Sequence, residues 1–165
     1  YSHSFQAQVD YEPIRLLDVR LAYRFYDVKT EYQSGLLEKP LVAAHRAFVN
    51  LGYSTKNQWK FDYTVQWIGS KRLPQHHSEH QNGLVASGNT PAYWMMNAQI
   101  NKVFKDGFLN VYAGVENILN EMQHPLIMGA SNPYGQNFDA SLVWGSGMGR
   151  NIYAGFKLNI GAKNQ

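Results

Sequence analysis

The segment HHSEH is the densest group of potential metal ligands in this 165-residue chain, with His76, His77, Glu79 and His80. Imidazole and carboxylate groups bind zinc, and His76 and His80 would share one side of a helical turn. Pro74 comes shortly before the cluster, and polar and glycine residues surround it. That composition is typical of a solvated loop, which we favour over a metal site.

No other pattern in the chain predicts catalysis. The segment GSGMG, residues 145–149, has the glycine content of a phosphate-binding loop, but a strand pattern follows it instead of a helix. We interpret it as a flexible turn, because glycine permits unusual backbone angles. Carboxylates on the polar sides of strands are expected to pair with neighbouring basic residues; these are Asp18, Asp62 and Glu116, with Arg20, Lys60 and Lys157 as partners. We therefore expect no catalytic residue, no cofactor and no enzyme activity.

The composition excludes several classes of protein. The chain has no cysteine, so it forms no disulfide and has no thiol chemistry. Its 15 Lys and Arg residues barely exceed its 12 Asp and Glu residues and form no basic run, so a nucleic-acid partner is not expected. Charged residues make up 16% of the chain and aromatic residues 14%, which indicates an ordered protein. No apolar run approaches the roughly 18 residues of a transmembrane helix.

The dominant signal is an alternation of apolar and polar residues, which is typical of β-strands with one apolar face. At the start of the chain, for example, Phe5, Ala7 and Val9 are separated by polar residues. The alternation recurs in seven segments, which are residues 4–11, 17–27, 45–54, 59–67, 94–101, 109–116 and 151–160. Helical spacing fits none of them. The sequence therefore predicts an all-β fold of about seven antiparallel strands.

Short and long connections between these strands alternate. The short ones are EPI with Pro13, TKNQ, and FKDG with a hairpin Asp106-Gly107 pair. The long ones cover residues 29–44, 69–92 and 118–149. An up-and-down sheet has this property when all tight turns lie at one end and all long loops at the other, as in outer-membrane barrels.

The two sides of the strands favour a membrane location. Several strands approach the 9–11 residues that a tilted membrane strand needs. The apolar side carries aromatic residues near the strand ends, where a membrane interface would lie: Tyr11, Tyr23, Tyr53, Trp59, Trp67 and Trp94. The other side carries residues suited to a wet lumen: Arg20, Arg24, Arg46, Lys60, Asp62, Gln66, Gln99, Asn110, Tyr112, Glu116, Tyr153 and Lys157. A soluble β-barrel that binds a small lipophilic ligand remains an alternative, as does a membrane barrel of another kind, such as a porin.

Seven strands are an unexpected number for a closed barrel. Bacterial single-chain barrels have even strand numbers, and an open strip leaves two unpaired edges that lipid cannot satisfy. We therefore expect the chain to form one arc of a larger transmembrane β-barrel, with short periplasmic turns and long extracellular loops.

The sequence also resembles a known family in several segments that occur in order. They are EKPLVAAHRAFVNLGY, WKFDYTVQWIGSKRLP, GVENILN, NPYG, FDASLVWG and GRNIYAGF. In these segments the chain is similar to the C-terminal part of the β-barrel of TonB-dependent outer-membrane receptors. The family fold is a 22-stranded barrel closed by an N-terminal plug, so the resemblance implies that residues 1–165 are the C-terminal barrel segment, without the plug and the N-terminal strands.

The resemblance implies a function in transport across the bacterial outer membrane. The substrates of such receptors are siderophores, cobalamin or glycans. The implied partners are outer-membrane lipid, the remainder of the barrel and plug, and the TonB motor complex, which acts through the plug. The loop with His76, His77 and His80 would then face the cell exterior, where it is available to a ligand.

Overall fold

Each alternating segment forms a strand in the computed structural model, which describes residues 1–74, 88–135 and 138–160. The strands are β1 (Ser2–Ile14), β2 (Leu17–Tyr32), β3 (Gly35–Glu38), β4 (His45–Ser54), β5 (Trp59–Ile68), β6 (Tyr93–Phe104), β7 (Leu109–Glu116) and β8 (Asn151–Leu158). A 3-10 turn, η2 (Lys105–Gly107), contains the predicted Asp106-Gly107 hairpin. In these described residues no helix is long and apolar enough to cross a membrane.

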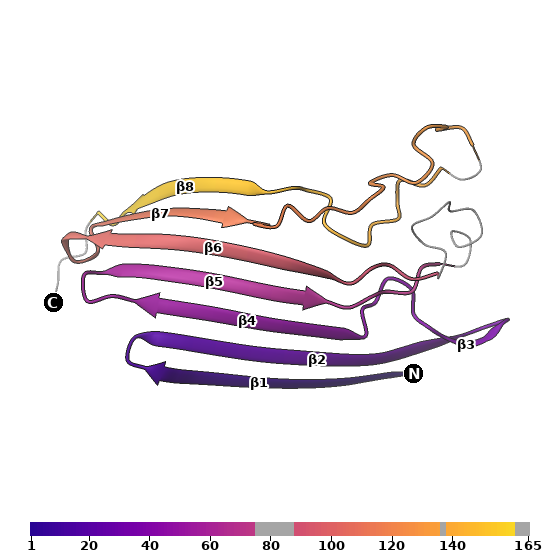
Figure 1. Ribbon diagram of the computed structural model, residues 1–165, viewed down its shortest axis with the longest axis horizontal. Coiled ribbons are helices and arrows are strands. Elements are labelled where there is room, and N and C mark those ends of the chain that lie inside the picture. The colour runs from indigo at the N-terminus through magenta and orange to yellow at the C-terminus, as the bar shows by residue number, and fades with distance from the viewer. Residues whose placement is uncertain (75–87, 136–137, 161–165) are drawn as a thin grey trace.

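The strands form a single antiparallel sheet in the order β1-β2-β4-β5-β6-β7-β8, and β3 pairs with the extended end of β2 (Figure 1). The predicted all-β, up-and-down arrangement of seven strands is therefore confirmed. The three tight turns lie together at the end of the sheet where β8 ends, and the long connections begin and end at the opposite end (Figure 1). The sheet is open, because β1 and β8 each pair with one neighbour within the described residues.

Two segments differ from the prediction. The connection over residues 29–44 is not simply a loop, because β2 runs on to Tyr32 and forms a hairpin with β3. The alternation is weak there, and Gly35 closes the turn with a φ of +108°. Pro13 does not end β1, which continues to Ile14 across a register irregularity. The irregularity lies between Tyr11 and Ile14, and a break in the ladder of this kind tolerates a residue without an N–H group.

The ladder register joins the apolar positions of all seven strands into one face. Across the middle of the sheet, Val9 lies opposite Leu21, Leu21 opposite Val49, Val49 opposite Val65, and Val65 opposite Met96. Many of these apolar-face side chains are exposed, including Phe5 at 61%, Ile152 at 74% and Phe156 at 70%. Among the described residues, no second layer covers this face.

The buried apolar cluster lies between the long connections instead of on the sheet. Leu73, Met128, Leu142 and Trp144 are almost completely buried and pack against Leu41 and Tyr93. The four buried residues come from two connections that are far apart in the sequence, and Leu41 comes from a third. The loop end of the sheet therefore has a packed core of its own.

Gln123 links the backbone of this loop core and is only 2% exposed. Its side-chain amide donates to the carbonyl of Leu142 at 2.8 Å, and its Oε1 accepts from the N–H groups of Trp144 at 2.7 Å and Gly145 at 3.0 Å. Its own N–H donates to the carbonyl of Ser146 at 2.8 Å. One side chain thus pairs backbone groups that would otherwise be buried without partners.

Gln123→Leu should loosen the loop core and leave the strands intact. The substitution leaves at least two buried backbone groups without a hydrogen-bond partner, at a cost of about 1–3 kcal/mol for each. Hydrogen exchange of the Trp144 and Gly145 amides should accelerate, while the ladder amides of β5 and β6 should keep their protection. Gln33→Leu, at an exposed position between β2 and β3, is the control. Unchanged exchange at Trp144 in the Gln123 variant would contradict the role given to this side chain.

Candidate functional site

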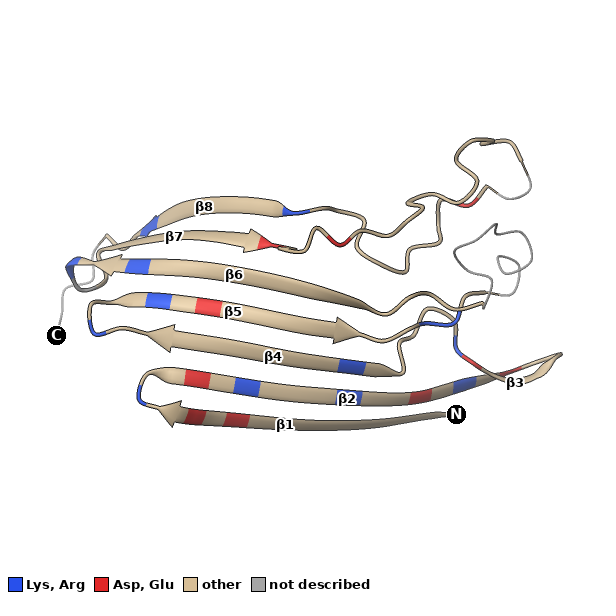
Figure 2. Ribbon diagram, in the orientation of Figure 1, with Lys and Arg blue, Asp and Glu red and all other residues tan. Residues whose placement is uncertain are grey.

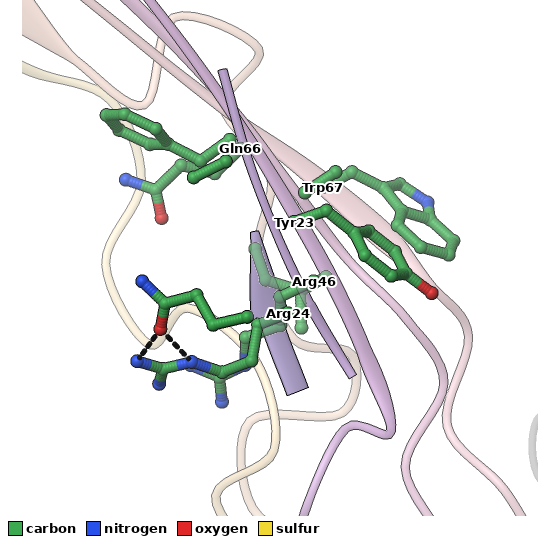
Figure 3. Close-up of a pocket in the computed structure, with 10 residues that line it drawn as sticks. Tyr23, Arg24, Arg46, Gln66 and Trp67 are labelled. Atoms are coloured by element: carbon green, nitrogen blue, oxygen red, sulfur yellow. Dashed lines mark hydrogen bonds between the residues drawn. The ribbon is translucent and has the colours of Figure 1, made fainter. Parts of the chain in front are cut away.

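The polar face of the sheet contains all twelve predicted lumen positions. Ladder pairs place these positions on one side: Arg20 is opposite Asn50, Asp62 opposite Gln99, and Gly114 opposite Tyr153. The full set is Arg20, Arg24, Arg46, Lys60, Asp62, Gln66, Gln99, Asn110, Tyr112, Glu116, Tyr153 and Lys157. Figure 3 shows part of this division, with Arg24, Arg46 and Gln66 on one side of the strands and Tyr23 and Trp67 on the other.

On the half of the polar face near the tight turns, the arginine forms an ion pair with a carboxylate. Arg20 forms an ion pair with Asp10 at 2.5 Å, and Gln8 donates to the same carboxylate at 2.7 Å. On the neighbouring strands, Asn50 donates to Asp62 and to Thr64, both at 3.0 Å. In this half of the face, Arg20 therefore has an ion-pair partner and the Asp62 carboxylate accepts hydrogen bonds.

The predicted carboxylate partners are therefore partly wrong. Arg20 pairs with Asp10 rather than Asp18, because the ladder register places Asp10 directly opposite. Asp62 accepts from Asn50 and not from Lys60.

The same correction applies to β7 and β8. Glu116 accepts from Asn151 at 3.4 Å instead of pairing with Lys157, whose ladder partner is Asn110. In the described part of the chain, neither Lys60 nor Lys157 forms an ion pair.

Charge is unevenly distributed along the face. Figure 2 shows acidic bands on β1, β2 and β5 toward the tight turns and others at the loop ends of β2 and β7, whereas β4 carries only a basic band, toward its loop end. That band is Arg46, whose ladder partner on β2 is Arg24. Two arginines therefore occupy facing positions on adjacent strands near the long connections.

The arginine pair borders a hollow of about 200 Å³. The polar-face residues Gln6, Arg24, Arg46, Phe48 and Gln66 are among those that line it (Figure 3). Arg24 donates through Nε and Nη2 to Oε1 of Gln6, at 3.0 and 2.7 Å. Sequence reasoning missed Gln6 and Phe48, although their places in the alternation assign both to the polar face.

Two tyrosines near the C-terminal edge are packed against glycines. Gly155 lies opposite Tyr112 and Gly114 opposite Tyr153, and the two rings are 6.3 Å apart. The Tyr153 hydroxyl donates to Oε1 of Gln99 at 2.7 Å. Both rings lie over the backbone of a neighbouring strand, so they fill the face rather than present a free surface for stacking.

The sequence predicts two candidate sites in the long connections, the histidine cluster and the GSGMG segment. The residues His76, His77 and His80 lie outside the described residues. The GSGMG segment is irregular and no helix follows it, as predicted; Gly149 approaches Asn120, whose Oδ1 accepts the Arg150 N–H at 2.9 Å. No group of three or more potential ligands in the described residues is arranged to hold a metal ion.

The apolar face has an aromatic row at each end. Near the tight turns, the Phe61 ring lies 6.4 Å from both Tyr53 and Trp59. Near the long connections, Trp67 and Trp94 are 6.4 Å apart. The eight residue steps from Trp59 to Trp67 span about 27 Å along the strand, which becomes roughly 20 Å at a barrel tilt of about 40°. This spacing is comparable with the apolar band of about 25 Å on outer-membrane barrels.

The fold resembles those of solved outer-membrane receptors. A point mutant of the ferric enterobactin receptor PfeA from Pseudomonas aeruginosa matches with a TM-score of 0.64 and 14% identity, over 92% of this chain and 21% of that chain. The unliganded ferric citrate transporter FecA matches with a TM-score of 0.62 and 16% identity, over 90% of this chain and 22% of that chain.

The sequence itself matches no protein-family model and no curated protein. This chain spans about a fifth of the length of either receptor. At these identities, the likeness shows the fold: an open antiparallel sheet similar to the barrels of TonB-dependent receptors.

Gly155→Ala should disturb the packing between β7 and β8. An added Cβ would lie 2.5 Å from the Tyr112 hydroxyl oxygen, so the ring would have to leave the strand backbone. Overpacking of this kind costs about 1–3 kcal/mol, which urea unfolding in lipid should detect.

Combining Gly155→Ala with Tyr112→Ala should recover part of the loss, because the obstructing ring is gone. Gly147→Ala is the control, since a Cβ at that position meets nothing within 4 Å. If Gly155→Ala were as stable as Gly147→Ala, this packing would not stabilise the sheet.

Proposed function

We propose that residues 1–165 form the C-terminal segment of the β-barrel wall of a TonB-dependent receptor in the bacterial outer membrane. The receptor imports siderophore, cobalamin or glycan-type substrates. The observation that carries the proposal is the seven-strand meander with one uncovered apolar face and one polar face, together with its likeness to two receptor barrels. The segment contributes wall, lumen side chains and extracellular loops, and it catalyses no reaction.

The exposed side chains of the apolar face fit contact with lipid. Leu21 and Ile100 are 45% and 36% exposed, and aromatic rows lie at both ends of this face. Water would disfavour so large an apolar surface, whereas lipid chains accept it. Outer-membrane lipid is accordingly one partner of the chain.

The free edges of β1 and β8 fit a sheet that continues. Unpaired N–H and C=O groups inside a membrane cost several kcal/mol each, so a barrel closes its edges. In the proposed receptor the remaining strands pair with both edges. The polar face then lines the lumen and faces the plug. The TonB motor acts on the receptor through that plug.

Val49→Arg should prevent correct insertion, and the adjacent Asn50→Arg should permit it. Val49 is on the apolar face midway along β4, where an arginine facing lipid costs about 2–4 kcal/mol. Asn50 is on the polar face beside Asp62, which can accept from an arginine. The measurement is the amount of heat-modifiable, folded receptor in the outer membrane.

Equal assembly of the two variants would argue against a lipid-facing apolar side. If the protein also remained a folded monomer without detergent, a soluble barrel with a lipophilic ligand would be the better assignment. The need for detergent and the assembly of the Val49→Arg variant are therefore two independent tests of whether the apolar face contacts lipid.

Uptake by the full-length receptor should require the TonB motor. Cells that express it would be supplied in turn with labelled ferric siderophores, cobalamin and oligosaccharides. Uptake of the true substrate should stop when TonB is deleted or the proton gradient is collapsed, while binding at the cell surface persists. Uptake that continues in both conditions would indicate a passive, porin-like barrel.

A further inference from the structure

Arg24 and Arg46 occupy directly facing ladder positions on the same face of adjacent strands. Like charges placed opposite each other destabilise a sheet. Within the described residues, the Arg46 side chain has no hydrogen-bond or ion-pair partner. The pair therefore has a repulsive energy that a bound negative group would relieve.

Among the described residues, no carboxylate lines the hollow beside the pair. Gln6, Phe48 and Gln66 line the hollow beside it, and Ile68 is the ladder partner of Arg46. On the polar face, Asp10 and Asp62 lie toward the tight turns. Glu116 lies at the loop end of β7, three strands from β4, and accepts from Asn151.

A third cation, Lys71, lies just beyond β5. Burial lowers the pKa of Lys71, and the positive charge of Arg46 lowers it further. The Lys71 ammonium donates to the Trp144 carbonyl and sits 5.5 Å from the Tyr93 ring centre, so it brings no negative charge to the site. Arg24, Arg46 and Lys71 thus bring positive charge together at the loop end of β2, β4 and β5, and within the described residues none of them forms an ion pair.

The Arg24 guanidinium is held in position before any ligand arrives. Gln6 accepts from its Nε and Nη2, and its Cζ lies 5.1 Å from the centre of the Tyr26 ring. Nη1 remains available for a further acceptor. Arg46 has its whole planar fork available, and such forks bind carboxylate and phosphate oxygens in pairs.

We propose that Arg24 and Arg46 form a binding subsite for an oxyanion group, carboxylate or phosphate, on the solute that the receptor takes up. The inference rests on the proposed function, because it assigns the polar face to the lumen. It narrows the substrate to a small, negatively charged solute. Arg46 supplies a free guanidinium that can donate two hydrogen bonds to the oxyanion. Arg24 supplies Nη1 from a guanidinium that Gln6 already holds in place.

The test uses the purified full-length receptor with citrate and inorganic phosphate as probes, measured by titration calorimetry at several salt concentrations. The wild type should bind at least one probe, more weakly as salt rises. Arg46→Gln and Arg24→Gln should each weaken binding about tenfold or more, because each removes charge-assisted hydrogen bonds.

Arg20→Gln is the matched control, because it removes the same charge from the same strand and face. Its guanidinium is already neutralised by Asp10, so affinity should change less than about twofold. Arg46→Lys keeps the charge and loses the fork, and it should bind with intermediate affinity. This variant also serves if Arg46→Gln fails to assemble.

Two results would overturn the subsite. If the wild type binds neither probe and Arg46→Gln lowers the melting temperature, a carboxylate from another part of the receptor occupies the pair. If Arg20→Gln weakens binding as much as Arg46→Gln, the probes are attracted by the total positive charge of the lumen and not by this arginine pair.

The subsite and the transport proposal can fail separately. Arginine-dependent probe binding without TonB-dependent uptake would support the subsite and reject the transport function. TonB-dependent uptake with probe binding unchanged in both Gln variants would support transport and reject the subsite.

Discussion

The register of the antiparallel ladder is the constraint on which both faces depend. Because side chains alternate from one face to the other, a slip of one residue in any strand would exchange its apolar and polar sets. Local contacts at the tight turns fix that register. The N–H of Leu16 donates to Oε1 of Glu12 at 2.9 Å, and the N–H of Ser54 donates to the Leu16 carbonyl at 2.8 Å. These contacts keep β1, β2 and β4 in one alignment, so Val19 and Arg20 face opposite sides.

The stabilising interactions are divided between the two ends of the molecule. The strands satisfy their backbone groups through the ladder, but in the described residues their apolar side chains have no covering layer. The long connections instead bury Trp144 and Leu142 around the amide of Gln123. The loop end therefore packs through this chain's own residues. The sheet leaves its apolar face uncovered, which is the property that the proposed wall between lipid and an aqueous interior requires.

The strands could be predicted from the sequence because alternation is a local property, and the seven segments agree closely with the seven strands of the main sheet. The loop core could not, since Leu73 and Met128 meet only after their connections fold back on each other. The polar pairs were only partly predictable. Alternation places Arg20 on the polar face beside Asp18 of the same strand, but it does not reveal that Asp10 lies opposite, because that depends on the alignment between strands.

Arg20 and Arg24 show how one ladder partner changes the chemistry of a side chain. They lie on the same strand and the same face, and their partners on β1 are Asp10 and Gln6. Asp10 neutralises Arg20 as an ion pair, whereas Gln6 orients Arg24 and leaves its charge in place. Since β4 then adds Arg46 opposite Arg24, positive charge accumulates at the loop end of the sheet. If every arginine on this face had a carboxylate partner, no part of the face would carry excess positive charge. Because Arg24 has the amide of Gln6 as its partner instead of a carboxylate, the charge of the polar face differs from one end of β2 to the other.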